Sequence, residues 1–323
     1  MTQTPKKQHK PAASGPGPLR FDFNKAAKKA LRDHPELRGR QMFIHAGRDD
    51  AAPFVEKLLL KGVDDEDIED LEKTIRTAKR LKTSFHQAVT RERGKPVGVL
   101  VFHPDRHPVF GVTSGAADDA GTFDHELGHA LTPDLQGTPA ENMADAFAAL
   151  RHFERFEDAT AHIRYAAWKR AAISMLTGTT SHLTTFTLDK IVIDAQAANF
   201  STLSPADAKA IAADYARKCT PSPKRLAKLA HDFAPLKKMP VTDAMEKLAA
   251  ITLKAKTSSD TFYLGARVLT QALAEPDLRL DGRRVKLAGP ERDAIRGRLT
   301  ARIEKLPKKH PLRKLGPNWR SYD

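Results

Sequence analysis

Two histidines four residues apart, in His125-Glu126-Leu127-Gly128-His129, constrain this chain more than any other feature. In an α-helix, residues four apart project from the same face, one turn apart. If this segment is helical, both imidazoles can reach one metal ion. The surrounding residues favour such a helix, because a buried metal-binding helix needs apolar side chains around it. These are Phe123, Leu127, Ala130 and Leu131.

Two other residues of the pentapeptide have expected roles. Glu126 follows the first histidine and would lie beside the metal, where its carboxylate can take a proton from a metal-bound water. Gly128 is a poor helix former that costs about 1 kcal/mol against alanine, and such a glycine often marks the close approach of another backbone or of a ligand. The HExxH pattern with these roles is typical of zinc-dependent peptidases, so it predicts an enzyme.

An acidic segment, residues 141–150, follows the pentapeptide closely. We expect it to be helical, with Pro139 near its start and its end near Phe156. Acidic residues in its first turns suit the positive end of the helix dipole. Glu141 and Asp145 are four apart, so they share one face of this second helix.

The expected ligand set is a catalytic one. A catalytic zinc site keeps three protein ligands and an open position, whereas a structural site usually closes with four. We expect His125, His129 and Glu141 to hold Zn²⁺, and Asp145 to accept a hydrogen bond from a ligating histidine. Asp134 or Asp145 remains an alternative to Glu141 as third ligand.

The HExxH pentapeptide followed by Glu141-x-x-x-Asp145 resembles the gluzincin arrangement of thermolysin-like metallopeptidases. There the ligand glutamate stands on a second helix, and an aspartate one turn later holds a zinc-binding histidine. The resemblance covers about residues 97–157, and the spacing from the pentapeptide to Glu141 is shorter than in thermolysin itself. The metzincin pattern is absent, because Thr132 and Leu135 stand where its glycine and third histidine would be.

The resemblance implies a zinc metallopeptidase of the endopeptidase type, which acts on a peptide or protein substrate. Glu126 would be the general base of the hydrolysis. Such enzymes also need a donor that stabilises the oxyanion, and His182, in a polar loop between two expected helices, is the first candidate. Tyr165 and Tyr263 are alternatives. The competing hypothesis is a basic helical protein that binds nucleic acid or another partner and carries a catalytically silent zinc site.

Two short β-branched segments precede the metal helix. Residues 97–102 and 109–113 predict a hairpin, joined by a proline-rich turn that contains His103 and His107. The second strand is a candidate for binding extended substrate by main-chain pairing, although a strand that only packs on the helices is an equal alternative. We expect both histidines of the turn to be solvated.

The rest of the chain predicts helices, so the expected fold class is α+β and mainly helical, with a small sheet packed on a zincin-type metal helix. A helix opens at the acidic run 64–70, and others are expected at about 158–177, 187–199, 205–217, 223–233, 241–255, 259–275 and 290–305. We divide the chain into a disordered basic tail (1–20), a zincin-like catalytic domain (21–178), a helical C-terminal lobe (179–306) and a basic tail (307–323).

Charge and composition limit the cellular context. Residues 1–48 carry 11 Lys and Arg against 3 Asp and Glu, and residues 279–323 carry 14 against 5, so the net charge of +14 belongs to the two ends. These ends could contact a polyanion. The single cysteine, Cys219, fits a reducing compartment. With no apolar signal segment near the start and no transmembrane stretch, we expect a cytoplasmic protein, or one exported without a classical signal peptide.

Overall fold

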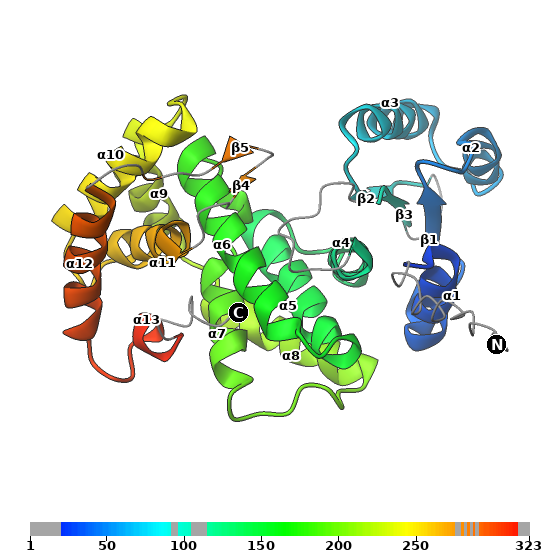
Figure 1. Ribbon diagram of the computed structural model, residues 1–323. Helices are drawn as coiled ribbons and strands as arrows, with labels where there is room; N and C mark the ends of the chain where they lie inside the picture. Colours follow the sequence, from blue (N-terminus) through cyan, green and yellow to red (C-terminus); the bar gives the residue numbers. More distant parts are fainter. Residues whose placement is uncertain are drawn as a thin grey trace, which may run out of the picture.

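The computed structural model describes residues 21–91, 96–104, 115–274, 279–280, 283–284, 287 and 291–315. Over these residues the chain is mainly helical and contains a small three-stranded sheet (Figure 1), so the predicted α+β class is confirmed. Among the described helices, none is both long and apolar enough to cross a lipid bilayer.

The elements follow in three groups along the chain. The first group is α1 (Phe23–Asp33), η1 (Pro35–Leu37), β1 (Gln41–His45), α2 (Ala52–Leu59), α3 (Asp65–Leu81), β2 (Phe85–Val89) and β3 (Val97–Phe102). The second is α4 (Gly115–Leu131), α5 (Gly137–Arg155), α6 (Ala159–Thr177), η2 (Thr180–His182), α7 (Thr185–Asp194) and α8 (Pro205–Cys219). The third is α9 (Pro223–Asp232), η3 (Ala234–Leu236), α10 (Val241–Lys254), α11 (Asp260–Ala274), β4 (Arg279–Leu280), β5 (Arg283–Arg284), α12 (Glu291–Glu304) and α13 (Pro311–Lys314).

The three-stranded sheet is mixed, in the order β1-β3-β2. The central strand β3 pairs in parallel with β1 and antiparallel with β2. All of its residues are buried, which explains why residues 97–102 are apolar on both faces of the strand. The strand predicted at 97–102 is therefore confirmed, but both of its partners come from segments that we had not assigned as strands. The predicted partner at 109–113 lies outside the described residues.

The expected solvation of the turn after β3 is wrong for one of its two histidines. His103 is only 7% exposed. Its Nδ1 lies 2.9 Å from the carbonyl oxygen of Pro104, which can only accept a hydrogen bond, so Nδ1 carries the proton. The backbone N–H of His103 also donates to the Ser84 hydroxyl. These contacts fix the end of β3 against the segment that leads into β2. His107 lies outside the described residues.

Helix α4 carries the HExxH pentapeptide and lies between the sheet and the helices α5 and α6 (Figure 1). On the sheet side, Phe123 of α4 packs against Phe43 of β1 and Phe102 of β3. On the other side, α4 packs closely along α5. A Cβ on Gly128 would lie 2.7 Å from the Cα of Ala144, so only a glycine lets the two backbones approach this closely. The predicted close approach at Gly128 is confirmed.

Substituting Gly128 with alanine tests this packing. Gly128→Ala should lower the free energy of unfolding by about 1–3 kcal/mol, because the added methyl group meets backbone that cannot move aside cheaply. Gly297 of α12 is the matched control, since a Cβ there meets nothing within 4 Å. Gly297→Ala should raise stability by up to about 1 kcal/mol through helix propensity alone. Urea unfolding of both variants measures the difference, and equal effects would contradict the close contact.

The predicted C-terminal helices are present, and one of them has different limits. Helix α7 spans Thr185–Asp194, whereas we predicted residues 187–199. The chain leaves the helix after Asp194 and makes a series of turns until Ser204 caps α8 by accepting a hydrogen bond from the Asp207 N–H.

Helix α6 belongs to two hydrophobic clusters. Its Trp168 is fully buried with α9, α10, α11 and the C-terminal segment. Its Ile163 and Ala167 are buried with α1, β3, α4, α5, α7 and α8. The helix therefore connects the metal-helix region with the C-terminal helices through continuous packing. The domain division between residues 178 and 179 stays a prediction.

Several arginines of α12 hold the C-terminal ends of neighbouring helices. Arg292 and Arg296 each donate to the carbonyl oxygen of Leu273, at the end of α11. Arg302 donates to carbonyl oxygens around the end of α10 and lies over the Phe262 ring, 4.6 Å from its centroid. A cation at this end of a helix is stabilised by the helix dipole. Some of the positive charge near the C-terminal end of the chain therefore stabilises the fold. Polyanion binding by this region stays a prediction.

Candidate metal centre

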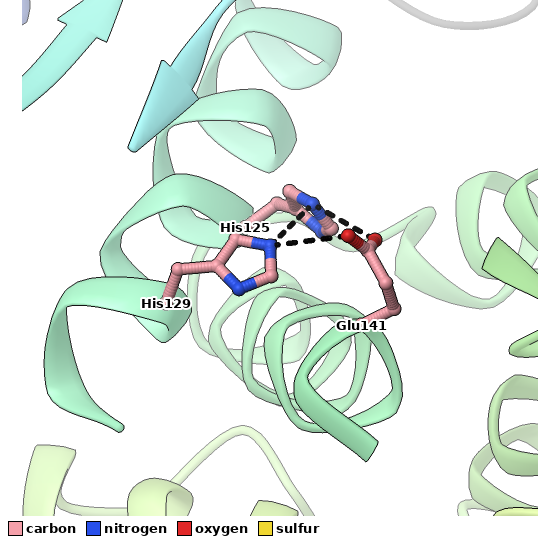
Figure 2. A group of neighbouring side chains, drawn as sticks. All are labelled: His125, His129 and Glu141. Atoms are coloured by element: carbon pink, nitrogen blue, oxygen red, sulfur yellow. Dashed lines mark hydrogen bonds and ion pairs between the residues drawn. The ribbon is translucent and has the colours of Figure 1, made fainter. Parts of the chain in front are cut away.

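Three side chains from α4 and α5 converge on one point (Figure 2). The Nε2 atoms of His125 and His129 are 3.2 Å apart. The Glu141 carboxylate faces both rings: Oε2 lies 3.6 Å from Nε2 of His125, and Oε1 lies 3.6 Å from Nε2 of His129. The helical spacing brings the two histidines together, and the close α4–α5 contact at Gly128 brings the glutamate to them. The structure therefore places all three predicted ligands together.

The dimensions of this triad suit a zinc ion. Four ligands arranged tetrahedrally at zinc–ligand distances of about 2.0–2.2 Å have their donor atoms roughly 3.4 Å from one another. The two nitrogens are 3.2 Å apart and each has a carboxylate oxygen at 3.6 Å, and with one donor atom from each residue all three atoms lie within 4.8 Å of one another. The Oε2 atom of Glu141 is buried and has no hydrogen-bond partner among the residues that the structure describes, an arrangement that is costly unless something else binds the oxygen. Two imidazoles and a carboxylate are also a donor set that zinc prefers.

The other two acidic candidates do not join the triad. Asp134 follows the end of α4 and is exposed to solvent. Asp145 lies behind His125, where its Oδ1 is 2.7 Å from Nδ1 of that ring. The predicted hydrogen bond between Asp145 and one of the two histidines is therefore present. Because the carboxylate accepts the Nδ1 proton, Nε2 of His125 is left with its lone pair facing the triad.

Arg170 and Thr184 complete the environment of Asp145, and we had predicted neither. Arg170, from α6, donates from Nε and Nη2 to the two carboxylate oxygens of Asp145 at 2.7 and 2.8 Å. Thr184, which precedes α7, donates its hydroxyl to Oδ2 at 2.6 Å. The guanidinium also reaches within 3.9 Å of Glu141. A charged residue among the buried alanines of α6 was the available signal for Arg170, whereas Thr184 offered none.

Burial and charge set the protonation of this group. Burial alone would raise the pKa of Asp145, but Arg170 and His125 outweigh it and hold that pKa well below its usual range. Burial alone would lower the pKa of His125, yet the carboxylate of Asp145 raises it. For His129, burial and the neighbouring His125 lower the pKa to about 3, so this ring stays neutral, as a metal ligand must be.

Glu126 lies on the same helix, but it is not part of the triad. It is 7% exposed and lines a cavity of about 420 Å³ together with His125 and Asp145. Burial is the main cause that raises the pKa of Glu126 to about 7, and Glu141 adds to the effect. Glu126 therefore lines the same cavity as His125 of the triad.

The three oxyanion candidates occupy different places. His182, in η2, lines the cavity and its Nε2 lies 3.4 Å from Glu141 Oε1. Tyr165 lines the same cavity from α6. Tyr263 does not line it: its hydroxyl donates to Asp189, which is buried and also accepts from Arg267. Tyr263 thus belongs to a buried network that ties α7 to α11.

A second pair of histidines lines the cavity away from the triad. The rings of His152 and His162 stack with their centroids 4.0 Å apart. Burial lowers the pKa of His152 to about 2 and that of His162 to about 4. His152 Nε2 and His162 Nδ1 lack hydrogen-bond partners among the described residues. Both rings are therefore neutral at physiological pH.

This pair should make the protein sensitive to mild acid. An unfolded histidine has a pKa of 6.5, so between pH 6.5 and 4 the unfolded chain binds more protons than the folded one. The stabilisation is fully present above pH 6.5 and is lost as the pH falls. From pH 7 to pH 5 each histidine should cost about 2 kcal/mol, so we expect wild type to lose about 4 kcal/mol more than a His152→Gln/His162→Gln variant. Urea unfolding with a chelator present measures this, and parallel pH dependences would contradict it.

Comparisons of the chain with protein-family models, with curated proteins and with solved structures find no match.

Proposed function

We propose that this protein is a zinc-dependent peptidase, in which His125, His129 and Glu141 hold the metal and Glu126 is the general base. One observation carries the proposal: two imidazoles and a carboxylate converge beside a cavity that Glu126 lines, and one carboxylate oxygen has no hydrogen bond to any described residue. Zinc bound there would act as a Lewis acid that polarises the scissile carbonyl and lowers the pKa of a water toward neutrality.

The protein's own residues perform the remaining tasks. Glu126 takes the proton from the attacking water and delivers it to the leaving amine. Asp145, held by Arg170 and Thr184, keeps the His125 ring in one orientation and one tautomer. His182 lies at the edge of the cavity beside Glu141, where an imidazole N–H can donate to an oxyanion.

Metal content and peptide cleavage together test this function. Purified protein should contain about one zinc per chain and should cleave an unbiased peptide library. A chelator should abolish the cleavage, and added zinc should restore it. His129→Ala should lose the metal and keep most of its helical content.

His231→Ala is the matched control, because His231 is an exposed histidine of α9. It should keep both zinc and activity. Stoichiometric zinc retained by a His125→Ala/His129→Ala variant would place the metal elsewhere. Zinc without cleavage of any peptide would favour a binding protein with a silent site.

A further inference from the structure

The cavity beside Glu126 is bounded by segments that are distant in the chain. Helices α4, α5 and α6 contribute most of its lining, and the corner between α3 and β2 contributes Lys82, Thr83 and Ser84. In Figure 1, α6 lies to the left of α4 and α3 lies above it. The cavity has a volume of about 420 Å³, which is in the range of pockets that bind small ligands. A peptide that reaches Glu126 must place side chains in this space.

Most of the charges in this cavity already have partners. Arg170 and Asp145 are joined by two hydrogen bonds. Asp118 is 8% exposed and already engaged with neighbouring groups. Glu126 is the proposed base. The remaining two charged groups are Lys82 and Lys169, and neither makes a hydrogen bond or ion pair within the part of the chain that the structure describes.

Both lysines line the cavity, where Lys169 is half-buried and Lys82 is exposed at the rim between α3 and β2. Lys169 lies on the face of α6 that also presents Arg170, and it is close enough to contribute to the lowered pKa of His162. Lys82 ends α3 in the left-handed conformation, with φ 57°, a position at which glycine is the residue of least strain. The neighbouring rings of His152 and His162 are neutral, so the lysines provide the unpaired positive charge of this wall.

From these observations we infer that the cavity is a specificity subsite for an acidic residue of the substrate. The carboxylate of an Asp or Glu side chain near the scissile bond would pair with Lys82 and Lys169. The inference rests on the proposed peptidase function and adds a substrate class to it. A peptide with Lys or Arg at the same place would meet two unpaired ammonium groups and would be disfavoured.

The first test is a cleavage profile. Wild type should cut a proteome-derived peptide library with Asp or Glu enriched next to the cleaved bond. Lys82→Glu/Lys169→Glu should lower kcat/KM for those peptides by about tenfold or more and should shift the preference toward Lys and Arg. Lys247→Glu/Lys256→Glu changes the net charge equally at exposed positions outside the cavity and should leave the profile unchanged. Zinc content and melting temperature should be the same in all three proteins.

A binding measurement separates the subsite from the catalytic function. A fluorescein-labelled decapeptide of alternating Ala and Glu should bind Glu126→Gln protein about tenfold more tightly than its Ala-Gln counterpart. Introducing Lys82→Glu/Lys169→Glu into the Glu126→Gln protein should remove this difference in affinity. Introducing Lys247→Glu/Lys256→Glu into the same protein should leave the difference unchanged. Lysine-dependent binding without any cleavage would leave the subsite standing and reject the peptidase. Cleavage without acidic preference, or equal binding by both reversal variants, would reject the subsite.

Discussion

Glu126→Gln should keep zinc and fold while losing peptide cleavage by a factor of about 10² or more. Glutamine preserves the shape of the side chain and its capacity for hydrogen bonding, but it cannot accept a proton at neutral pH. Glu126 lies next to the triad and lines the cavity, yet the structure places Glu141 and not Glu126 against the two imidazoles. The substitution therefore removes the proposed base and leaves the three proposed ligands in place.

The measurement compares wild type and Glu126→Gln on one unbiased peptide library, with zinc content determined on the same samples. Glu157→Gln is the matched control, because Glu157 is exposed and lies outside the cavity. It should cleave as wild type does. Equal cleavage by wild type and Glu126→Gln would point to another base or to a contaminating protease. No cleavage by either, with zinc bound, would indicate a silent site or a very narrow substrate range.

The helices that carry the triad follow from local sequence. Two histidines four apart with apolar flanks favour the helix that became α4, and Glu141 and Asp145 share a face of α5 as their spacing requires. Gly128 indicated the close approach of a backbone or a ligand, and the structure shows that the neighbour is the backbone of α5 at Ala144. The relative placement of His125, His129 and Glu141 was thus predictable, because it depends on helical periodicity and on one close contact.

The partners of β3 in the sheet, and the contact of Arg170 with Asp145, could not be predicted in the same way. The strands at 41–45 and 85–89 are short and only partly buried, without a regular alternation of buried and exposed residues. Arg170 reaches Asp145 only because α6 crosses beside α5, and that crossing depends on packing among residues distant in sequence. The burial of His103 likewise depends on its contact with Ser84, on the segment before β2.

Glu141 and Asp145 should differ sharply in their effect on zinc binding. Glu141→Ala removes a proposed ligand, so the zinc affinity should fall by about 10³-fold or more. Asp145→Asn keeps the proposed ligands but removes the negative charge of the group that accepts a hydrogen bond from His125 Nδ1. It also leaves the guanidinium of Arg170 without its anionic partner. We expect a loss of about 10- to 100-fold in zinc affinity, as for other groups that orient a ligand.

Competition with a chromophoric chelator at fixed pH measures both affinities, and urea unfolding of the metal-free variants separates loss of metal from loss of fold. Asp145→Asn should also destabilise the metal-free protein, since Arg170 would keep its charge in a partly buried position without compensation. Glu141→Ala should have a smaller effect on the stability of the metal-free protein. Oε2 of Glu141 has no hydrogen-bond partner among the described residues, so removing this carboxylate breaks fewer stabilising contacts. If Asp145→Asn empties the site while Glu141→Ala retains zinc, the two roles are reversed, and the gluzincin-like ligand set is wrong.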